Sequence, residues 1–377
     1  MANTFKFGNG KWAVKDGYAL AYNDENGNFK PLPFDFTRST SATRVNKQGL
    51  IETVGSNEPR IDFTDANGAL LLEPSRTNLY TYSNDVSFWT KSNVVTTSNY
   101  AISPDGTQNA FRAAFSSSTG LLYVTATGTT GTNNTLSVWA KSNNGSSNKF
   151  RFFANGTTTL SNDFIATDEW QRFEFTYNCT SVTSGLTGAS DSATNDIIFY
   201  GFQHEVGSYA TSIINTSGSA VTRVADTAQI EDFKNTSTEG VVFYDFTANN
   251  IESANGQYLL QLFAGSSVIS TAYSSSNSIS IIANGGLIQI FNNAFSQTLY
   301  SVNPPQNSRQ KFAIRYDGTN IVAFVNGVKQ TVYADTSTGV KNAFRLNNGE
   351  NSSYKNNGLI YYNTALTDAE LIALTTI

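Results

Sequence analysis

Short runs in which apolar and polar residues alternate fill most of this chain, and tight-turn dipeptides separate them. Asn-Gly occurs ten times, including at Asn67, Asn326 and Asn357, and Asp-Gly occurs three times. Both residues of such dipeptides tolerate the positive φ of two-residue hairpin turns. Alternating apolar residues flank the Asp317-Gly318 turn: Phe312, Ile314 and Tyr316 before it, Ile321, Ala323 and Val325 after it. The pattern predicts an all-β chain of antiparallel sandwiches or barrels.

Helix signals are scarce. The exception is Thr367-Asp-Ala-Glu-Leu-Ile-Ala-Leu374, where Thr367 and Glu370 have the spacing of a capping box. We therefore predict one short helix at the C-terminal end.

The chain divides into three segments by composition. Residues 1–82 hold four of the seven prolines and a run rich in arginine, and residues 83–230 hold three of the four tryptophans. The polar stretch 232–239 is typical of a linker, and residues 240–377 form a last unit rich in hairpin signals. We predict an attachment and oligomerisation module followed by two β-sandwiches.

Composition narrows the possible functions. Charged residues make up 14% of the chain and aromatic residues 13%, which is typical of a folded chain. The net charge of −5 argues against nucleic-acid binding, and Cys179 has no partner cysteine. The first residues lack the apolar core of a signal peptide, and no apolar run approaches the ~20 residues of a membrane span. We therefore expect folding in a cytoplasm and no membrane insertion.

Three arginines recur sixteen residues apart in the first segment, at Arg44, Arg60 and Arg76. A hairpin series that sets guanidinium groups against Glu52, Glu58, Glu73 or a neighbouring subunit would explain this spacing. Ordinary surface salt bridges would explain it too.

Residues 34–79 resemble a module of bacteriophage head-spike and tail-fibre proteins. The resemblance is carried by Arg38, Ala42-Thr-Arg-Val-Asn46, Gly49-Leu-Ile-Glu52, Pro59-Arg60 and Leu71-Leu-Glu-Pro-Ser-Arg-Thr-Asn-Leu79. It implies a structural subunit of a virion fibre or spike, displayed on the virion surface and assembled as a homotrimer with capsid or tail proteins. It implies that Arg38, Arg44, Arg60, Glu73 and Arg76 serve attachment or oligomerisation.

The two later segments resemble sugar-binding sandwiches. Residues 83–228 are similar to carbohydrate-binding jelly rolls through Phe88-Trp-Thr-Lys91, Leu136-Ser-Val-Trp-Ala-Lys141, Glu169-Trp-Gln-Arg-Phe173, Gln203-His-Glu-Val-Gly-Ser-Tyr-Ala-Thr-Ser212 and Gly218-Ser-Ala-Val-Thr-Arg-Val-Ala-Asp226. Residues 240–377 resemble concanavalin- or laminin-G-like sandwiches through 312–320, 323–327 and 361–371. This implies host surface polysaccharide as a partner.

Catalytic chemistry has little support. His204 is the single histidine, so no histidine or cysteine partner completes a typical zinc site, and no cofactor is implied. Glycoside hydrolysis needs two carboxylates, for which Asp168, Glu169, Glu174 and Glu205 are candidates. Calcium needs oxygen ligands, for which Asp335 or Asp317 is a weak candidate. We expect a non-enzymatic protein, with a polysaccharide depolymerase and a purely structural capsid decoration as alternatives.

Trp139 is the first candidate for a sugar platform. Leu136, Val138 and Ala140 form one apolar strand face, so Trp139 points to the other face between polar neighbours. Packing under a loop or against another subunit is the alternative. The further glycan candidates are Lys141, Arg151, Phe153, Tyr200 and Gln203.

Overall fold

The computed structural model describes residues 4–8, 14–15, 18–23, 28–31, 35–65, 67–126, 130–181, 183–191, 195–230, 233, 235–250, 257–263, 277–293, 296–337, 339–346 and 353–377. Most of these residues lie in β-strands, and the paired strands are antiparallel. One α-helix follows the last strand. The all-β fold class is confirmed.

The chain folds into two compact units that are discontinuous in sequence. Unit 1 comprises Met1–Ser41, Val54–Ser75 and Val224–Ile377, and unit 2 comprises Ala42–Thr53 and Arg76–Arg223. The chain therefore crosses between the units four times. This grouping differs from the three predicted segments, because residues 1–82 contribute to both units.

The larger sheet of unit 1 has the strand order β2-β3-β1-β33-β24-β29-β30-β31, with β4 beside β3, β9 beside β33 and β8 beside β9. Its strands are β1 Thr4–Gly8, β2 Val14–Lys15, β3 Tyr18–Asn23, β4 Asn28–Pro31, β8 Ile61–Asp62, β9 Ala69–Leu72, β24 Gly240–Asn250, β29 Ser308–Tyr316, β30 Asn320–Val325, β31 Val328–Ala334 and β33 Ser353–Tyr362.

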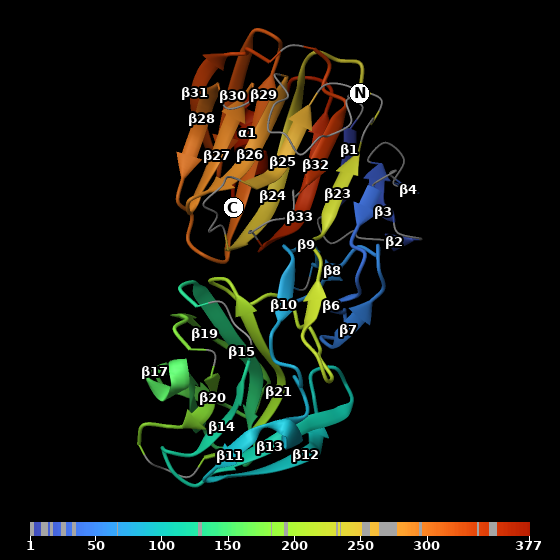
Figure 1. The fold of residues 1–377 in the computed structure, drawn as a ribbon. Coiled ribbons are helices and arrows are strands. Elements are labelled where there is room, and N and C mark those ends of the chain that lie inside the picture. The colour runs from blue at the N-terminus through green and yellow to red at the C-terminus, as the bar shows by residue number, and fades with distance from the viewer. Residues whose placement is uncertain are drawn as a thin grey trace. The chain divides into compact units, whose positions relative to one another are not determined.

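The second sheet of unit 1 has the order β28-β27-β26-β25-β32-β23-β5 (Figure 1). Its strands are β5 Asp35–Thr37, β23 Thr227–Ile230, β25 Gln257–Phe263, β26 Ser278–Asn284, β27 Leu287–Asn292, β28 Gln297–Val302 and β32 Ala343–Leu346. The main core of unit 1 draws on both sheets. It includes the predicted apolar faces of β29 and β30, with Phe312, Ile314, Tyr316, Ile321, Ala323 and Val325 all buried.

Strand β24 is buried on both faces. Val242, Tyr244 and Phe246 enter the main core, whereas Val241 and Phe243 lie in a second cluster with Leu371 of helix α1 (Asp368–Thr375). The helix therefore covers the other face of the larger sheet. Thr367 Oγ1 accepts the Glu370 N–H, and the Glu370 carboxylate accepts the Thr367 N–H, so the predicted capping box is confirmed.

The turn dipeptides fall into two groups. Asp317-Gly318 joins β29 to β30, and Asn326-Gly327 joins β30 to β31 with φ of 49° and 84°, as predicted. Asn357-Gly358 is not a turn, so that prediction is wrong. It lies inside β33, where Asp245 is paired with Gly358 and Phe246 with Asn356. Asn357 is thus the extra residue of a β-bulge.

Unit 2 contains a five-stranded sheet, β12-β13-β21-β15-β19, and a six-stranded sheet, β11-β14-β20-β16-β17, with β18 beside β16 (Figure 1). Two strand pairs, β10-β22 and β6-β7, complete it. The strands are β6 Ala42–Val45, β7 Ile51–Val54, β10 Arg76–Asn78, β11 Thr90–Ser92, β12 Val94–Ile102, β13 Gln108–Phe115, β14 Leu121–Thr125, β15 Asn133–Ser142, β16 Asn148–Ala154, β17 Thr159–Leu160, β18 Phe164–Ala166, β19 Gln171–Asn178, β20 Thr183–Gly188, β21 Asn195–Val206 and β22 Val221–Arg223. Two 3₁₀ turns lie at Val86–Phe88 and Asn155–Thr157.

The core of unit 2 is rich in aromatic rings. Leu136, Val138 and Ala140 of β15 are buried in it, as predicted, together with Cys179. A smaller cluster on the other face of the five-stranded sheet joins Ile51 of β7 and Ile213 to strand residues such as Tyr200. Both faces of this sheet are therefore covered in part by other segments of unit 2.

Candidate functional site

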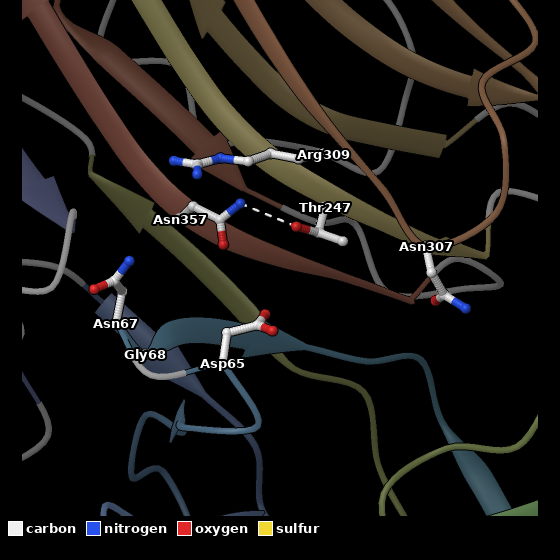
Figure 2. Close-up of a pocket in the computed structure, with 7 residues that line it drawn as sticks. All are labelled: Asp65, Asn67, Gly68, Thr247, Asn307, Arg309 and Asn357. Atoms are coloured by element: carbon white, nitrogen blue, oxygen red, sulfur yellow. Dashed lines mark hydrogen bonds between the residues drawn. The ribbon is translucent and has the colours of Figure 1, made fainter. Parts of the chain in front are cut away.

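A pocket lined mainly by residues with polar side chains lies in unit 1 and has a volume of about 340 Å³ (Figure 2). The lining residues come from four chain segments: Asp65, Asn67, Gly68, Thr247, Asn307, Arg309 and Asn357. Six of them carry side chains that donate or accept hydrogen bonds. None of the seven is aromatic or aliphatic, so the pocket suits a ligand covered with hydrogen-bonding groups.

Regular strands hold one wall of the pocket. Thr247 of β24 is directly opposite Arg309 of β29 and opposite Lys355 of β33. Asn357 reaches the same wall because the bulge in β33 changes the direction of its side chain, as bulges beside binding sites commonly do. The wall is therefore built on the centre of a sheet and not on loops.

Asp245 fixes the wall from behind. Its buried carboxylate accepts hydrogen bonds from Arg309 Nε at 2.8 Å and from Arg309 Nη2 at 2.5 Å. These hydrogen bonds raise the pKa of Arg309 above its ordinary value. Asn357 Nδ2 donates to Asp245 Oδ1 at 3.2 Å and to Thr247 Oγ1 at 3.0 Å. One carboxylate thus orients two of the lining side chains.

A short turn between β8 and β9 provides the opposite wall. Asp65 and Asn67 are exposed there, and the Gly68 N–H donates to the Asp65 carbonyl at 2.9 Å. Lys355 lies beside this turn, with its Nζ 3.1 Å from Asp62 Oδ1 and 3.8 Å from Asp65 Oδ2. Lys355 therefore pairs more closely with Asp62 than with Asp65, and the Asp65 carboxylate stays exposed at the pocket.

Several polar atoms of the lining have no partner in the part of the chain that the structure describes. Asn357 Nδ2 donates two hydrogen bonds, whereas Asn357 Oδ1 accepts no hydrogen bond within the described residues. Figure 2 shows this oxygen directed away from Thr247. The side-chain amides of Asn67 and Asn307 are also without hydrogen bonds within the described residues. Arg309 Nη1 likewise makes no hydrogen bond within the described residues. The pocket therefore offers both donors and acceptors to a ligand.

Sequence reasoning missed this pocket. Asn67 and Asn357 were noticed as parts of turn dipeptides, and no local pattern marks Thr247, Asn307 or Arg309. The one available signal is Gly358 itself, because a glycine inside a strand often marks a bulge.

The glycan candidates predicted in unit 2 are not brought together on one open face. Trp139 is half-buried and packs in the cluster that contains Ile51 and Ile213, which matches packing under a loop. Lys141 Nζ lies 5.2 Å from the centroid of the Trp170 ring. Trp139 and Lys141 remain untested as sugar contacts.

The other four candidates are engaged within unit 2. Arg151 donates from Nε to the Gly188 carbonyl at 3.1 Å, and Phe153 is fully buried. Tyr200 is buried and donates to Asp105 Oδ2 at 2.9 Å. Gln203 is fully buried and donates to Glu205 Oε2 at 2.7 Å. Phe153, Tyr200 and Gln203 therefore present no surface to a glycan in this conformation.

Three of the predicted attachment residues form a buried network in unit 1. Arg38 Nη1 donates to Asp226 Oδ1 at 2.9 Å, and Arg60 donates to Asp226 Oδ2 and, at 2.7 Å, to Glu73 Oε2. Burial alone would lower the pKa of Arg60, but the charges of Asp226 and Glu73 outweigh it and raise the pKa. These side chains are inaccessible to a partner in this conformation, and their visible role is to hold unit 1 together.

The other two attachment candidates lie in unit 2. Arg44 Nε donates to Glu52 Oε1 at 2.7 Å in a partly exposed pair, which matches the predicted Arg–Glu pairing. The Arg76 guanidinium lies 5.0 Å from the centroid of the Tyr209 ring. A role for Arg44 or Arg76 in assembly stays a prediction.

The carboxylates considered for hydrolysis are either exposed or engaged by neighbouring groups. Asp168 and Glu169 are exposed, Glu174 accepts the Ala210 N–H at 3.2 Å, and Glu205 is buried with three hydrogen bonds from Gln203 and Thr211. A buried Glu205 that is saturated by its neighbours is not placed to act on a sugar.

The calcium candidates are engaged by neighbouring residues. Asp317 Oδ1 accepts the N–H groups of Thr319 and Asn320, as expected of a turn residue. Asp335 Oδ1 accepts the N–H and the hydroxyl of Ser337. Among the described residues, no three His, Cys, Asp or Glu side chains group as a metal site would require. Calcium binding at Asp335 remains a prediction.

His204 lies on β21 and is buried in unit 2. Its Nε2 is 3.0 Å from Asn134 Oδ1 and 3.2 Å from the Tyr177 hydroxyl, and burial lowers its pKa to about 4. The residue is therefore neutral at physiological pH and belongs to the interior.

Scans against protein-family models and against curated proteins give no match for this chain. Among solved structures, the CBM40 domain of the Ruminococcus gnavus IT-sialidase bound to α2,3-sialyllactose is 16% identical, with 40% of this chain and 98% of that chain covered and a TM-score of 0.28. Domain 4 of the Geobacillus stearothermophilus arabinanase AbnA, in complex with arabinotriose, is also 16% identical, with 40% and 73% covered and a TM-score of 0.29.

The binding domain of botulinum neurotoxin serotype D is 9% identical, with 39% of each chain covered and a TM-score of 0.30. TM-scores this low assign neither a ligand nor a family to this chain. Within the described residues, no helix is long and apolar enough to cross a membrane.

Proposed function

We propose that this protein is a non-enzymatic subunit of a bacteriophage fibre or spike that contacts host surface glycans, and that the polar pocket of unit 1 is a glycan site. The observation that carries the glycan part is the set of polar atoms around the pocket that have no partner within the described residues, together with a wall built on β24, β29 and β33. A sugar hydroxyl both donates and accepts, so it fits a lining that offers both.

The rigidity of the wall supports binding. Asp245 holds Arg309 and Asn357 in place before any ligand arrives, so their ordering entropy is not lost on binding. A side chain that is already oriented gains more net affinity from each hydrogen bond than a mobile one does.

The carboxylate content of the pocket supports the absence of catalysis. Glycoside hydrolysis requires two carboxyl groups on either side of the scissile bond. Asp65 is the single carboxylate among the seven lining residues, and Asp245 behind them is occupied by Arg309. We therefore expect binding without cleavage, and incubation with bacterial polysaccharide should release no new reducing ends.

The virion part of the proposal rests on the resemblance of residues 34–79 to head-spike and tail-fibre proteins. It carries the expectation of a homotrimer at the virion surface that assembles with capsid or tail proteins. Light scattering of the purified protein tests the trimer, and antibody labelling of purified particles tests the location. A stable monomer, or particles that do not label, would contradict this part.

Paired variants test the glycan part. Asn67→Ala and Asn307→Gly remove exposed amides that make no hydrogen bond within the described chain. Glycine is used at 307 because the φ there is 57°, which disfavours alanine, so folding should be unchanged. The double variant should bind an array of bacterial surface polysaccharides about tenfold more weakly than the wild type. Asn303→Ala is the control, because Asn303 is exposed in the same unit and outside the lining. A double variant that binds as the wild type does excludes this pocket as the glycan site.

A further inference from the structure

The charges around the pocket indicate which sugars it accepts. Five charged side chains lie on or directly behind its walls: Asp62, Asp65, Asp245, Arg309 and Lys355. Three of these five described side chains are carboxylates and two are cations, so the carboxylates outnumber the cations by one.

The two cations are committed to carboxylates other than Asp65. Arg309 donates two hydrogen bonds to Asp245, and Lys355 is closer to Asp62, at 3.1 Å, than to Asp65, at 3.8 Å. The Asp65 side chain is 66% exposed and faces the pocket with most of the uncompensated charge. An anionic ligand would therefore meet a carboxylate at the rim and a guanidinium whose charge is already neutralised.

We propose that the pocket is selective for neutral sugars and discriminates against sugars that carry a carboxylate. This rests on the proposed glycan function and specifies its ligand class. The Asp65 and Asn357 oxygens accept from the hydroxyls of the sugar, and the amides of Asn67 and Asn307 donate to them. Two adjacent hydroxyls on one ring can satisfy an acceptor on one wall and a donor on the other.

Two further properties follow from the lining. Because none of the seven residues is aromatic, the sugar is bound by its hydroxyl edges without ring stacking, and single-site affinity is weak. Because Asp65 is the single lining carboxylate, recognition needs no divalent cation. Multivalent presentation then provides the measurable avidity.

The test uses sugars that differ in one group. Glucose and galactose, and their C6-oxidised counterparts glucuronate and galacturonate, are displayed at equal density on a polymer, and binding of the full chain is measured at low ionic strength. The neutral sugars should bind about five- to tenfold more tightly than the uronates, from repulsion at about 5 Å across a partly solvated site. Chelation of divalent cations should change neither value.

Asp65→Asn keeps the shape of the rim and removes its charge. It should raise binding of the uronates about five- to tenfold relative to binding of the neutral sugars by the same variant. Asp35→Asn is the matched control, because Asp35 is exposed in unit 1, lies outside the lining and changes the net charge equally.

The outcomes separate the two proposals. Equal or tighter binding of uronates by the wild type overturns the neutral-sugar selectivity and leaves the glycan function standing. The same holds if Asp65→Asn does not change the discrimination. Failure of neutral and anionic sugars alike overturns both, provided that a broad polysaccharide array is also negative.

Discussion

Arg60 and Asp226 form an ion pair in the interior of unit 1, although 166 residues separate them in the sequence. Asp226 also accepts from Arg38, and its backbone N–H donates to the Glu73 carbonyl at 3.0 Å. Two arginines and two carboxylates thus balance their charges where water does not reach them. Arg38, Arg60 and Glu73, three of the candidate attachment residues, therefore stabilise the interior of unit 1.

Asp226→Asn should destabilise unit 1 by about 4 kcal/mol, because it removes the carboxylate that pairs with two buried guanidinium groups. Hydrogen exchange followed by mass spectrometry should show faster exchange in peptides from 224–250 and 353–377. Glu52→Gln removes the partner of Arg44 in a partly exposed pair and should cost at most about 1 kcal/mol. Similar effects of the two substitutions would contradict a structural role for the buried network.

Acidification should destabilise unit 2 through His204. Its pKa in the folded protein is about 4, below the ordinary value of 6.5, so the unfolded chain binds a proton more readily than the folded one. The stability from the neutral imidazole is complete above about pH 6.5 and is lost as the pH falls towards 4, by about 3 kcal/mol in total. Urea unfolding followed by tryptophan fluorescence at pH 7.5 and pH 4.5 measures it. His204→Gln should show a smaller pH dependence, and an unchanged dependence would assign the effect to other groups.

Trp139→Ala should lower the stability of unit 2 by about 2 kcal/mol, because the ring packs against Ile213 and its neighbours. Phe88→Ala is the comparison, because Phe88 is 59% exposed and its ring centroid lies 3.9 Å from that of Tyr82. This substitution should lower the stability of unit 2 by less than about 1 kcal/mol. Far-UV circular dichroism during urea unfolding gives both values. If Trp139→Ala abolished glycan binding and left stability intact, the ring would be a sugar contact after all.

Two glycines on neighbouring hairpins separate backbone strain from crowding. Gly318 and Gly327 have φ of 77° and 84°, but an added Cβ meets open space at Gly318 and the Thr376 Oγ1 at 3.1 Å at Gly327. Gly318→Ala should cost about 1 kcal/mol, and Gly327→Ala about 1 kcal/mol more. Hydrogen exchange in helix α1 should rise in the Gly327 variant alone, because the Gly327 N–H donates to Thr375 Oγ1. Equal exchange in both variants would show that the helix end adapts.

Local patterns predicted the local structure well. Alternation placed Leu136, Val138 and Ala140 on the core side of β15, because side chains of a strand alternate between faces whatever the tertiary context. The capping box at Thr367 and Glu370 depends on three residues of spacing and was confirmed for the same reason. These features require no knowledge of distant segments.

Features formed by distant segments were not predicted. Trp139 is covered by Ile213, which lies on another segment, and no periodicity in β15 reveals that cover. Arg60 pairs with Glu73, one of the glutamates that local spacing had suggested, but no local pattern indicated Asp226, which pairs with both Arg38 and Arg60. The pocket depends on a bulge at Asn357 and on residues from four segments, so its geometry exists only after the sheet has formed.

The discontinuous units change what a cut or a pull does to this chain. A protein whose domains follow one another is joined by one backbone line at each junction, so one protease cut separates them and any tension passes through that line. Here four backbone lines join the two units, and on the unit 1 side residues beside every crossing, at Arg38, Gly55, Glu73 and Asp226, belong to one hydrogen-bonded group. A single nick at any crossing leaves three covalent connections in place. A force that pulls the units apart would be divided among four segments of backbone. Hydrogen bonds connect these four segments to one another on the unit 1 side.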